Sequence, residues 1–218
     1  MRVVIAGGHG KIALLLEQLL AGRGDQALGL IRNPAHVAEV QKAGADAVIC
    51  DLEAASAGDV AVLLSGADAV VFAAGAGAGS GAPRKDTVDR AASALMADAA
   101  ERAGVRRFVQ ISSMGAGQPP RPGSDEVWAA YIAAKTAAEA DLRDRDLDWI
   151  IVRPGGLTDA PATGRIRLAP PPVPRGTIPR ADVAAVIAAL LDNPGTRHQT
   201  LELVSGDSPV AAAVHSVS

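Results

Sequence analysis

Short runs of apolar residues alternate with segments of helical periodicity along most of the chain. Near-continuous apolar runs are typical of parallel strands buried on both faces, whereas apolar residues three and four positions apart indicate the core face of a helix. The predicted strands are Arg2–Ala6, Ala27–Arg32, Ala47–Cys50, Ala69–Ala74, Arg107–Ile111, Trp149–Val152 and Leu201–Val204. This alternation predicts right-handed crossovers and an α/β fold with a doubly wound parallel sheet of about seven strands.

Two segments interrupt the alternation. Gly75–Pro83 is rich in glycine and follows the fourth predicted strand, and Ala160–Pro179 is rich in proline. We predict a single domain over residues 1–218, in which residues 155–180 form a lid or small substrate lobe, a short C-terminal excursion on the substrate side. The alternative for both segments is a flexible surface loop. The last eight residues, AAAVHSVS, are predicted to fray because they lack turn residues and anchors.

Composition narrows the class of protein. The 218 residues are 49% hydrophobic and 21% charged, as in a globular chain, and the formal net charge is -3. No basic patch stands out, which argues against a nucleic-acid partner, and no apolar stretch reaches the roughly 18 residues that span a membrane. A single cysteine, Cys50, cannot form an internal disulfide, so we expect a cytoplasmic protein. We further expect a small-molecule substrate, no membrane partner, and a monomer or homodimer.

The first predicted strand ends in a glycine cluster, Gly7-x-x-Gly10-x-x-Ala13, which also contains Gly8. Such a turn lets the backbone approach a pyrophosphate closely, and the amides of the following helix N-terminus supply hydrogen-bond donors. The sequence therefore predicts a dinucleotide site here. His9, Lys11 and Ile12 are further candidate contacts, with side chains that face water as the alternative for His9 and Lys11.

Residues at the ends of the next predicted strands indicate which dinucleotide binds. Arg32 follows the second strand, 25 residues after Gly7, where NAD sites usually carry an acidic residue and where an arginine suits a 2′-phosphate. We therefore predict a preference for NADP(H) over NAD(H); the alternative is a solvated loop cation. Asp51 and Leu52 follow the third strand and are candidates for the adenine pocket, with a helix N-cap as the alternative for Asp51. The small residues Ala73, Ala74 and Gly75 are candidates for the floor under the cofactor.

The second half of the chain carries candidate catalytic residues. Ser113 follows the fifth strand, and Tyr131-x-x-x-Lys135 places a phenol and an ammonium one helical turn apart on the same face. A nearby ammonium stabilises a phenolate, which makes tyrosine usable as an acid and base near neutral pH. The alternative is an ordinary amphipathic helix face. The histidines show no metal-ligand spacing, so we expect no metal.

These motifs together resemble the short-chain dehydrogenase/reductase superfamily, and within it the atypical, NmrA-like or NAD(P)-binding epimerase/dehydratase-like branch. The resemblance covers nearly the whole chain, including RRFVQISS, IVRPGGL (151–157) and IPRADVA (178–184). It implies a Rossmann fold with Tyr131 as acid and base, Lys135 as its partner and a cofactor contact, and Ser113 as the substrate-orienting hydroxyl. It also implies that Arg153-Pro154 shapes the turn after the sixth strand, beside the nicotinamide. Ile111, Pro154 and Gly155 are further candidate cofactor contacts.

The resemblance implies an NAD(P)H-dependent oxidoreductase that reduces a small carbonyl, quinone or flavin-like acceptor. Relatives that act on nucleotide sugars are longer and carry a larger C-terminal substrate domain, and the short proline-rich segment here argues against such a substrate. Two alternatives stay open. One is a non-catalytic NADP(H)-binding regulator that senses redox state, and the other is a sugar epimerase or dehydratase-type enzyme.

Overall fold

The computed structural model describes residues 1–77, 79–119, 123 and 125–218, and within them nine strands form one sheet in the order β11-β8-β10-β6-β5-β4-β1-β2-β3. Seven of these strands run parallel. They are β1 (Arg2–Ala6), β2 (Gln26–Ile31), β3 (Asp46–Ile49), β4 (Ala69–Phe72), β5 (Arg107–Ile111), β6 (Asp148–Pro154) and β10 (Gln199–Ser205). Each overlaps one predicted run, which confirms the doubly wound α/β fold.

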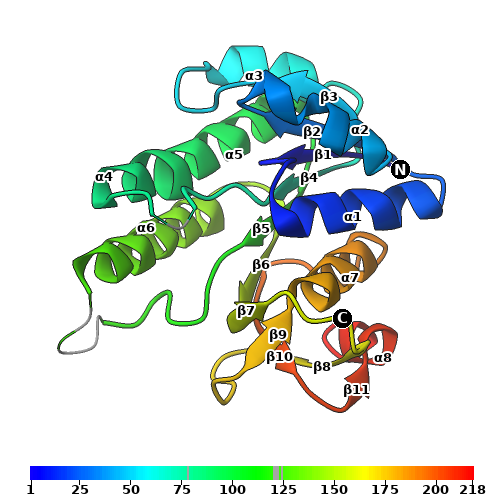
Figure 1. The fold of residues 1–218 in the computed structure, drawn as a ribbon, viewed down its shortest axis with the longest axis vertical. Coiled ribbons are helices and arrows are strands. Elements are labelled where there is room, and N and C mark those ends of the chain that lie inside the picture. The colour runs from blue at the N-terminus through cyan, green and yellow to red at the C-terminus, as the bar shows by residue number, and fades with distance from the viewer. Residues whose placement is uncertain (78, 120–122, 124) are drawn as a thin grey trace.

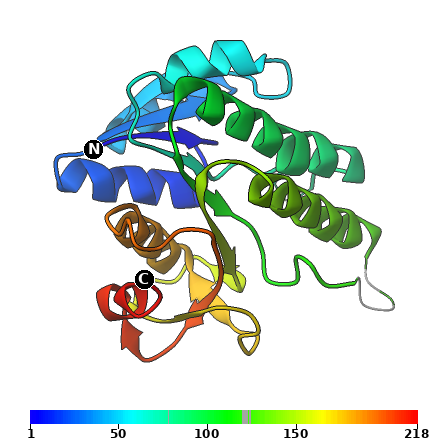
Figure 2. The same ribbon diagram turned by 180° about the vertical axis from the view of Figure 1, so that it is seen from behind.

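Helices cover both faces of the sheet (Figures 1 and 2). Helices α1 and α7 lie on one face, and α3, α5 and α6 lie on the other. The helical elements are α1 (Lys11–Gly22), the 3₁₀ turn η1 (Pro34–His36), α2 (Val37–Lys42), α3 (Ala57–Leu64), α4 (Ala82–Arg84), the π-helix η2 (Lys85–Ala91), α5 (Ala92–Ala103), α6 (Glu126–Arg143), α7 (Arg180–Leu191) and α8 (Val210–His215).

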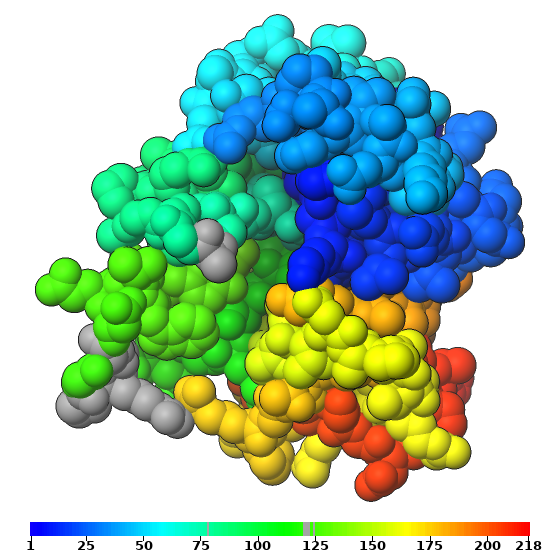
Figure 3. All heavy atoms as spheres, viewed as in Figure 1, coloured from blue at the N-terminus to red at the C-terminus, as the bar shows by residue number. Residues whose placement is uncertain are grey.

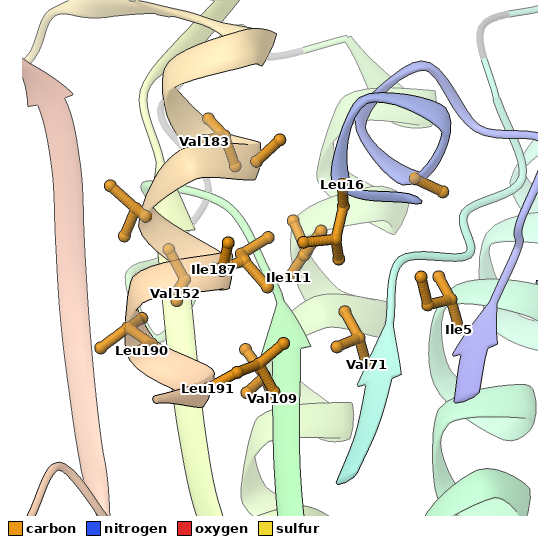
Figure 4. Close-up of a cluster of buried hydrophobic side chains, with 14 of the residues drawn as sticks. Ile5, Leu16, Val71, Val109, Ile111, Val152, Val183, Ile187, Leu190 and Leu191 are labelled. Atoms are coloured by element: carbon orange, nitrogen blue, oxygen red, sulfur yellow. The ribbon is translucent and has the colours of Figure 1, made fainter. Parts of the chain in front are cut away.

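Strand alternation divides the core between the two faces, because successive side chains of a strand point to opposite sides. On one face, Val71 and Val109 pack under Leu16 of α1 and Ile187 of α7 (Figure 4). On the other face, buried residues of the strands meet buried residues of α3, α5 and α6; among them are Phe72, Phe108, Met96 and Leu142. The order of strands reverses at β1, which pairs with β2 on one side and β4 on the other. Ligands of such sheets bind at this switch point, beyond the carboxyl ends of the strands.

The proline-rich segment contains more regular structure than a loop. Strand β8 (Arg165–Ala169) pairs antiparallel with β10, and β11 (Ser208–Pro209) pairs antiparallel with β8. A separate two-stranded sheet joins β7 (Gly156–Thr158) to β9 (Thr177–Pro179). The flexible-loop alternative is therefore wrong for this segment, and the main sheet has nine strands because β8 and β11 extend its edge. In Gly75–Pro83, α4 begins at Ala82, and Ala78 lies outside the described residues.

The predicted fraying of the C-terminus is also wrong. Residues Val210–His215 form α8, in which Ala213 and Val214 are buried. These two side chains belong to the same hydrophobic cluster as α7 and β8. The partly buried Val210 and Val217 pack against the same cluster, and the Gln199 side chain donates to the Val217 carbonyl at 2.9 Å, so the end of the chain is docked. No helix of the described ranges is both long and apolar enough to cross a membrane.

Glu17 is a fully buried carboxyl group on the inner face of α1. Among the described residues, neither of its oxygens has a hydrogen-bond partner. The side chain lies against the backbone of Gly8 and Gly29, where an added Cβ would stand 3.1 Å and 2.9 Å from Oε1. Burial raises the pKa of Glu17 from 4.5 to about 8, because the charged form is poorly solvated there. The native protein therefore holds this proton at neutral pH.

Replacing Glu17 with methionine is expected to stabilise the protein at neutral and alkaline pH. Between pH 4.5 and 8 the unfolded chain has released the proton and the native chain has not, so native stability falls as pH rises through this window. The variant removes this dependence on pH. The stability recovered at pH 7 is on the order of 3 kcal/mol. Urea unfolding at pH 5, 7 and 8 measures it, with Glu17→Gln as the non-ionisable variant of equal size. Parallel pH profiles for wild type and both variants would contradict the assignment.

Candidate functional site

The glycine turn after β1 is fixed by close contacts between backbones. The amides of Gly7 and Gly8 both donate to the carbonyl of Leu30 at 3.1 Å, and the Gly10 amide donates to the Gly7 carbonyl at 2.8 Å. Gly7 has φ +78°, and a Cβ on it would stand 2.6 Å from the Cα of Ala74. A side chain at Gly7 would therefore push the turn away from β4. The turn keeps the ends of β1, β2 and β4 close together.

Helix α1 begins directly after this turn and is open to an anion. Gly10 is its N-cap, no side chain caps it within the described part of the chain, and its first turn carries no acidic residue. Its first amides thus point beyond the sheet with the positive end of the helix dipole. This arrangement fits a pyrophosphate, as the sequence predicts.

A cavity of about 370 Å³ extends from the glycine turn across the ends of β2, β3 and β4. In the view of Figure 3 it opens on the face where the N-terminal turn meets the segment after β4. The predicted cofactor residues that line it are Gly7, His9, Gly10, Arg32, Asp51, Leu52, Ala73, Ala74 and Gly75. Its position and lining fit the adenosine half of a dinucleotide.

The remaining predicted cofactor residues lie outside that lining. Gly8 packs against Gly29, and half-buried Ile12 packs against the core. Lys11 is exposed and pairs with Asp159 at 2.5 Å, and Asp159 also pairs with Arg180. Exposed ion pairs are weak, so this contact holds Lys11 only loosely.

Ile111, Pro154 and Gly155 stand at the carboxyl ends of β5 and β6. The Gly155 amide donates to the Leu203 carbonyl at 2.9 Å, and the Pro154 carbonyl accepts from the Met114 amide at 3.0 Å. A Cβ on Gly155 would stand 2.3 Å from the Gly176 carbonyl oxygen, so the segment before β9 passes close to the end of β6.

Arg32 belongs to a cluster that joins two distant segments. Its Nη1 donates to Glu53 Oε2 at 3.0 Å, and Nη2 of Arg84 donates to the same oxygen at 2.7 Å. The other carboxylate oxygen accepts from the hydroxyl of Thr87 at 2.6 Å. The hydrogen bonds from Thr87 and Arg84 hold the pKa of Glu53 below its usual range, so Glu53 stays ionised. Arg32 therefore has an ion-pair partner, although its side chain remains 54% exposed.

Asp51 forms a turn with its own backbone. Its Oδ1 accepts from the Glu53 amide at 3.1 Å, and its carbonyl accepts from the amides of Ala54 and Ala55. Asp51 does not cap a helix: the N-cap of α3 is Ser56, which forms a capping box with Asp59. The turn leaves Asp51 and Leu52 at the cavity wall.

Two ammonium groups approach the Tyr131 ring. Lys135 Nζ is 5.7 Å from the centre of the ring, and Lys85 Nζ approaches to 5.4 Å. Lys135 is buried, donates to the Ile111 carbonyl at 3.1 Å and pairs with Asp89 at 3.1 Å. Lys85 donates to the Gly77 carbonyl at 2.9 Å and has no carboxylate partner among the described residues. The Tyr131 ring thus has two cations beside it, one of them neutralised.

Asp89 connects this cluster to the floor of the cofactor cavity. Its Oδ2 accepts from the Ala76 amide at 3.2 Å, while its Oδ1 faces Lys135. Asp89 is almost completely buried, and a Cβ on Gly75 would stand 3.1 Å from Oδ1. The loop after β4 is thereby tied to the helix that carries Tyr131 and Lys135.

The two serines after β5 have different surroundings. Ser113 is half-buried, and its hydroxyl makes only a long contact of 3.4 Å with the Met114 carbonyl. Ser112 is buried and donates to Glu139 at 2.5 Å. Arg153 donates to both oxygens of Glu139, at 2.8 Å and 2.5 Å, and Arg143 adds a contact at 2.7 Å. The Ser112 hydroxyl is committed to this network, whereas the Ser113 hydroxyl makes no shorter contact within the described part of the chain.

The sequence did not indicate four of these residues. Glu53, Arg84, Lys85 and Asp89 bring no motif with them, and Glu53 is separated from Arg84 by 31 positions. The only available signal was the KDTVD run, where Lys85 and Asp89 are spaced four residues apart. In the part of the chain that the structure describes, no group of three His, Cys, Asp or Glu side chains could hold a metal ion.

Comparison with known proteins provides independent evidence. Residues 7–194 match the protein family described as NAD(P)H-binding. The chain is 34% identical over 215 residues to the uncharacterized sugar epimerase YhfK of Bacillus subtilis, covering 98% of this chain and 99% of YhfK. A Bacillus halodurans structure named provisionally as an NAD-dependent epimerase/dehydratase superposes with a TM-score of 0.91 at 34% identity, covering 99% of each chain. The oxidoreductase YlbE of Lactococcus lactis gives 0.86 at 27% identity, covering 100% of this chain and 96% of YlbE.

Proposed function

The protein belongs to the NAD(P)H-binding family, and on that premise we propose that it is an NAD(P)H-dependent oxidoreductase with Tyr131 as its proton donor and acceptor. The family and the relatives fit the atypical short-chain dehydrogenase/reductase branch. The observation that carries the proposal is the proximity of two ammonium groups to the Tyr131 ring. One of them, Lys135, pairs with Asp89, whose other oxygen accepts from the Ala76 amide at the cavity wall. The substrate is a small carbonyl, quinone or flavin-like acceptor.

The bound cofactor supplies a hydride, and the chain supplies the proton and the alignment. Tyr131 gives its hydroxyl proton to the acceptor oxygen, and the ammonium groups of Lys85 and Lys135 stabilise the phenolate that remains. Ser113 donates a hydrogen bond to the same acceptor oxygen. Asp89 and the Ile111 carbonyl fix the position of Lys135. Tyr131 and Lys135 come from α6, Lys85 and Asp89 come from η2, and Ser113 follows β5.

The similarity to YhfK, which is named as a sugar epimerase, favours a second candidate function, that of a sugar epimerase. Such an enzyme uses the cofactor transiently and returns it unchanged. Incubation with NADPH and a panel of quinones, flavins, small carbonyls and nucleotide sugars separates the possibilities. Net NADPH consumption supports the reductase, conversion of a sugar without net consumption supports the epimerase, and tight NADPH binding without turnover of any compound supports a redox-sensing regulator.

We propose that the cofactor is NADP(H), with Arg32 binding the 2′-phosphate. Arg32 lines the cavity, and its guanidinium is half-exposed, so it can reach a ligand there. Replacing it with alanine is expected to weaken NADPH binding by about 10- to 100-fold, the worth of a charge-assisted hydrogen bond, and to leave NADH binding unchanged. Calorimetric titration of both cofactors measures this. Equal affinity of the wild type for NADH and NADPH would refute the assignment.

A further inference from the structure

Arg84 lines the same cavity as Arg32 and belongs to no sequence motif. It ends α4, which follows the glycine-rich segment after β4, whereas Arg32 follows β2. Both residues line the same cavity as the glycine turn. Their guanidinium groups converge because each donates to the same oxygen of Glu53, at 2.7 Å and 3.0 Å.

Two guanidinium groups that share one oxygen atom repel each other, and Glu53 offsets this repulsion. The carboxylate is itself held by Thr87 from the π-helix, so it has a fixed position between the two arginines. The side chains of Arg32 and Arg84 remain 54% and 39% exposed, and both residues line the cavity. A phosphate group presents several oxygens and can accept from both forks at once.

We propose that Arg84 is a second ligand of the cofactor's 2′-phosphate and that Glu53 holds the two arginines together to receive it. This inference rests on the proposed NADP(H) preference. The phosphate would then be held between the end of β2 and α4, which both line the cavity. A phosphomonoester next to an adenosine is thus the chemical class that this pair of arginines recognises.

The proposal is tested with ligands that lack the nicotinamide, so that binding is measured apart from turnover. Calorimetry compares adenosine 2′,5′-bisphosphate with adenosine 5′-monophosphate on wild type, Arg84→Met and Arg84→Lys. Arg84→Met is expected to bind the bisphosphate about tenfold more weakly and the monophosphate unchanged. Arg84→Lys, which keeps the charge and loses the fork, is expected to fall between the two.

Arg90→Met is the matched control. Arg90 lies on the adjoining π-helix and pairs with Asp86, and it does not line the cavity among the described residues. Its substitution is expected to change neither affinity. An Arg84→Met protein that keeps the full preference for the bisphosphate, or that loses affinity for both ligands equally, overturns the inference. A wild type that binds both ligands equally refutes the NADP(H) preference itself, and a preference lost only in Arg32→Ala refutes the role of Arg84 alone.

Discussion

Replacing Tyr131 with phenylalanine is expected to lower kcat by a factor of about 10²–10⁴, the usual contribution of a positioned acid or base. The change removes one hydroxyl group and keeps the ring that lies beside Lys85, Lys135 and Trp128. Cofactor affinity is expected to stay the same, because Tyr131 does not line the cavity that receives the adenosine half. Steady-state turnover with any acceptor that the panel identifies, together with calorimetry of NADPH, measures both quantities.

The control for Tyr131 is Ala137→Ser, on the exposed face of the same helix α6. It is expected to leave kcat and cofactor affinity unchanged, so that a loss in Tyr131→Phe cannot be assigned to the helix as a whole. Turnover in Tyr131→Phe equal to that of the wild type would contradict the proposed mechanism. Since Tyr131 is the single tyrosine of the chain, the ultraviolet spectrum of the variant also verifies the substitution directly.

Replacing Glu139 with alanine is expected to lower the free energy of unfolding by about 3–5 kcal/mol, the usual cost of leaving a buried charge unpaired. Glu139 is completely buried, and its loss leaves the buried guanidinium of Arg153 without a carboxylate. Burial by itself raises the pKa of Glu139, but the hydrogen bonds from Arg153 and Ser112 outweigh it, so the net direction is down. Urea unfolding at pH 7 measures the loss.

The pH dependence of Glu139 has a definite sign. A carboxyl group whose native pKa is depressed stabilises the fold above its unfolded pKa of 4.5, and this contribution is lost as pH falls through the lower native pKa. The difference in the free energy of unfolding between wild type and Glu139→Ala is therefore expected to become smaller at acidic pH. The double variant Glu139→Leu with Arg153→Met removes both charges and is expected to recover most of the stability. A free energy of unfolding for Glu139→Ala that lies within about 1 kcal/mol of the wild-type value would contradict the importance of this network.

The parallel strands were predictable because a strand covered on both faces must be apolar nearly throughout, as in β1 and β4. Strand β8 was missed for the opposite reason. Ile166 and Leu168 are buried and Arg167 between them is exposed, so the strand alternates, and the surrounding prolines hid this short pattern. In α8, Ala213 and Val214 were too small to indicate a docked helix.

The candidate site was predictable only where the residues that form it lie close together in the sequence. The glycine turn places its backbone next to Ala74 because Gly7 has no side chain, and that requirement can be read from the sequence. Glu53 and Arg84 meet only because separate crossovers return to the same end of the sheet. Likewise, the Tyr131-x-x-x-Lys135 spacing indicated the lysine on the same helix and gave no information on Lys85, which arrives from η2.

Asp182 shows how firmly the segment beyond β6 is attached. It is fully buried in the first turn of α7, and it accepts from the amides of Thr163 and Gly164 at 3.0 Å and 2.8 Å and from the Thr163 hydroxyl at 2.9 Å. Moving residues 163–164 away from α7 would leave the buried carboxylate of Asp182 without its three hydrogen-bond donors, which costs free energy. The backbone at 163–164 is therefore anchored to the first turn of α7, and any movement of this corner has to carry the start of α7 with it or leave a buried charge unpaired.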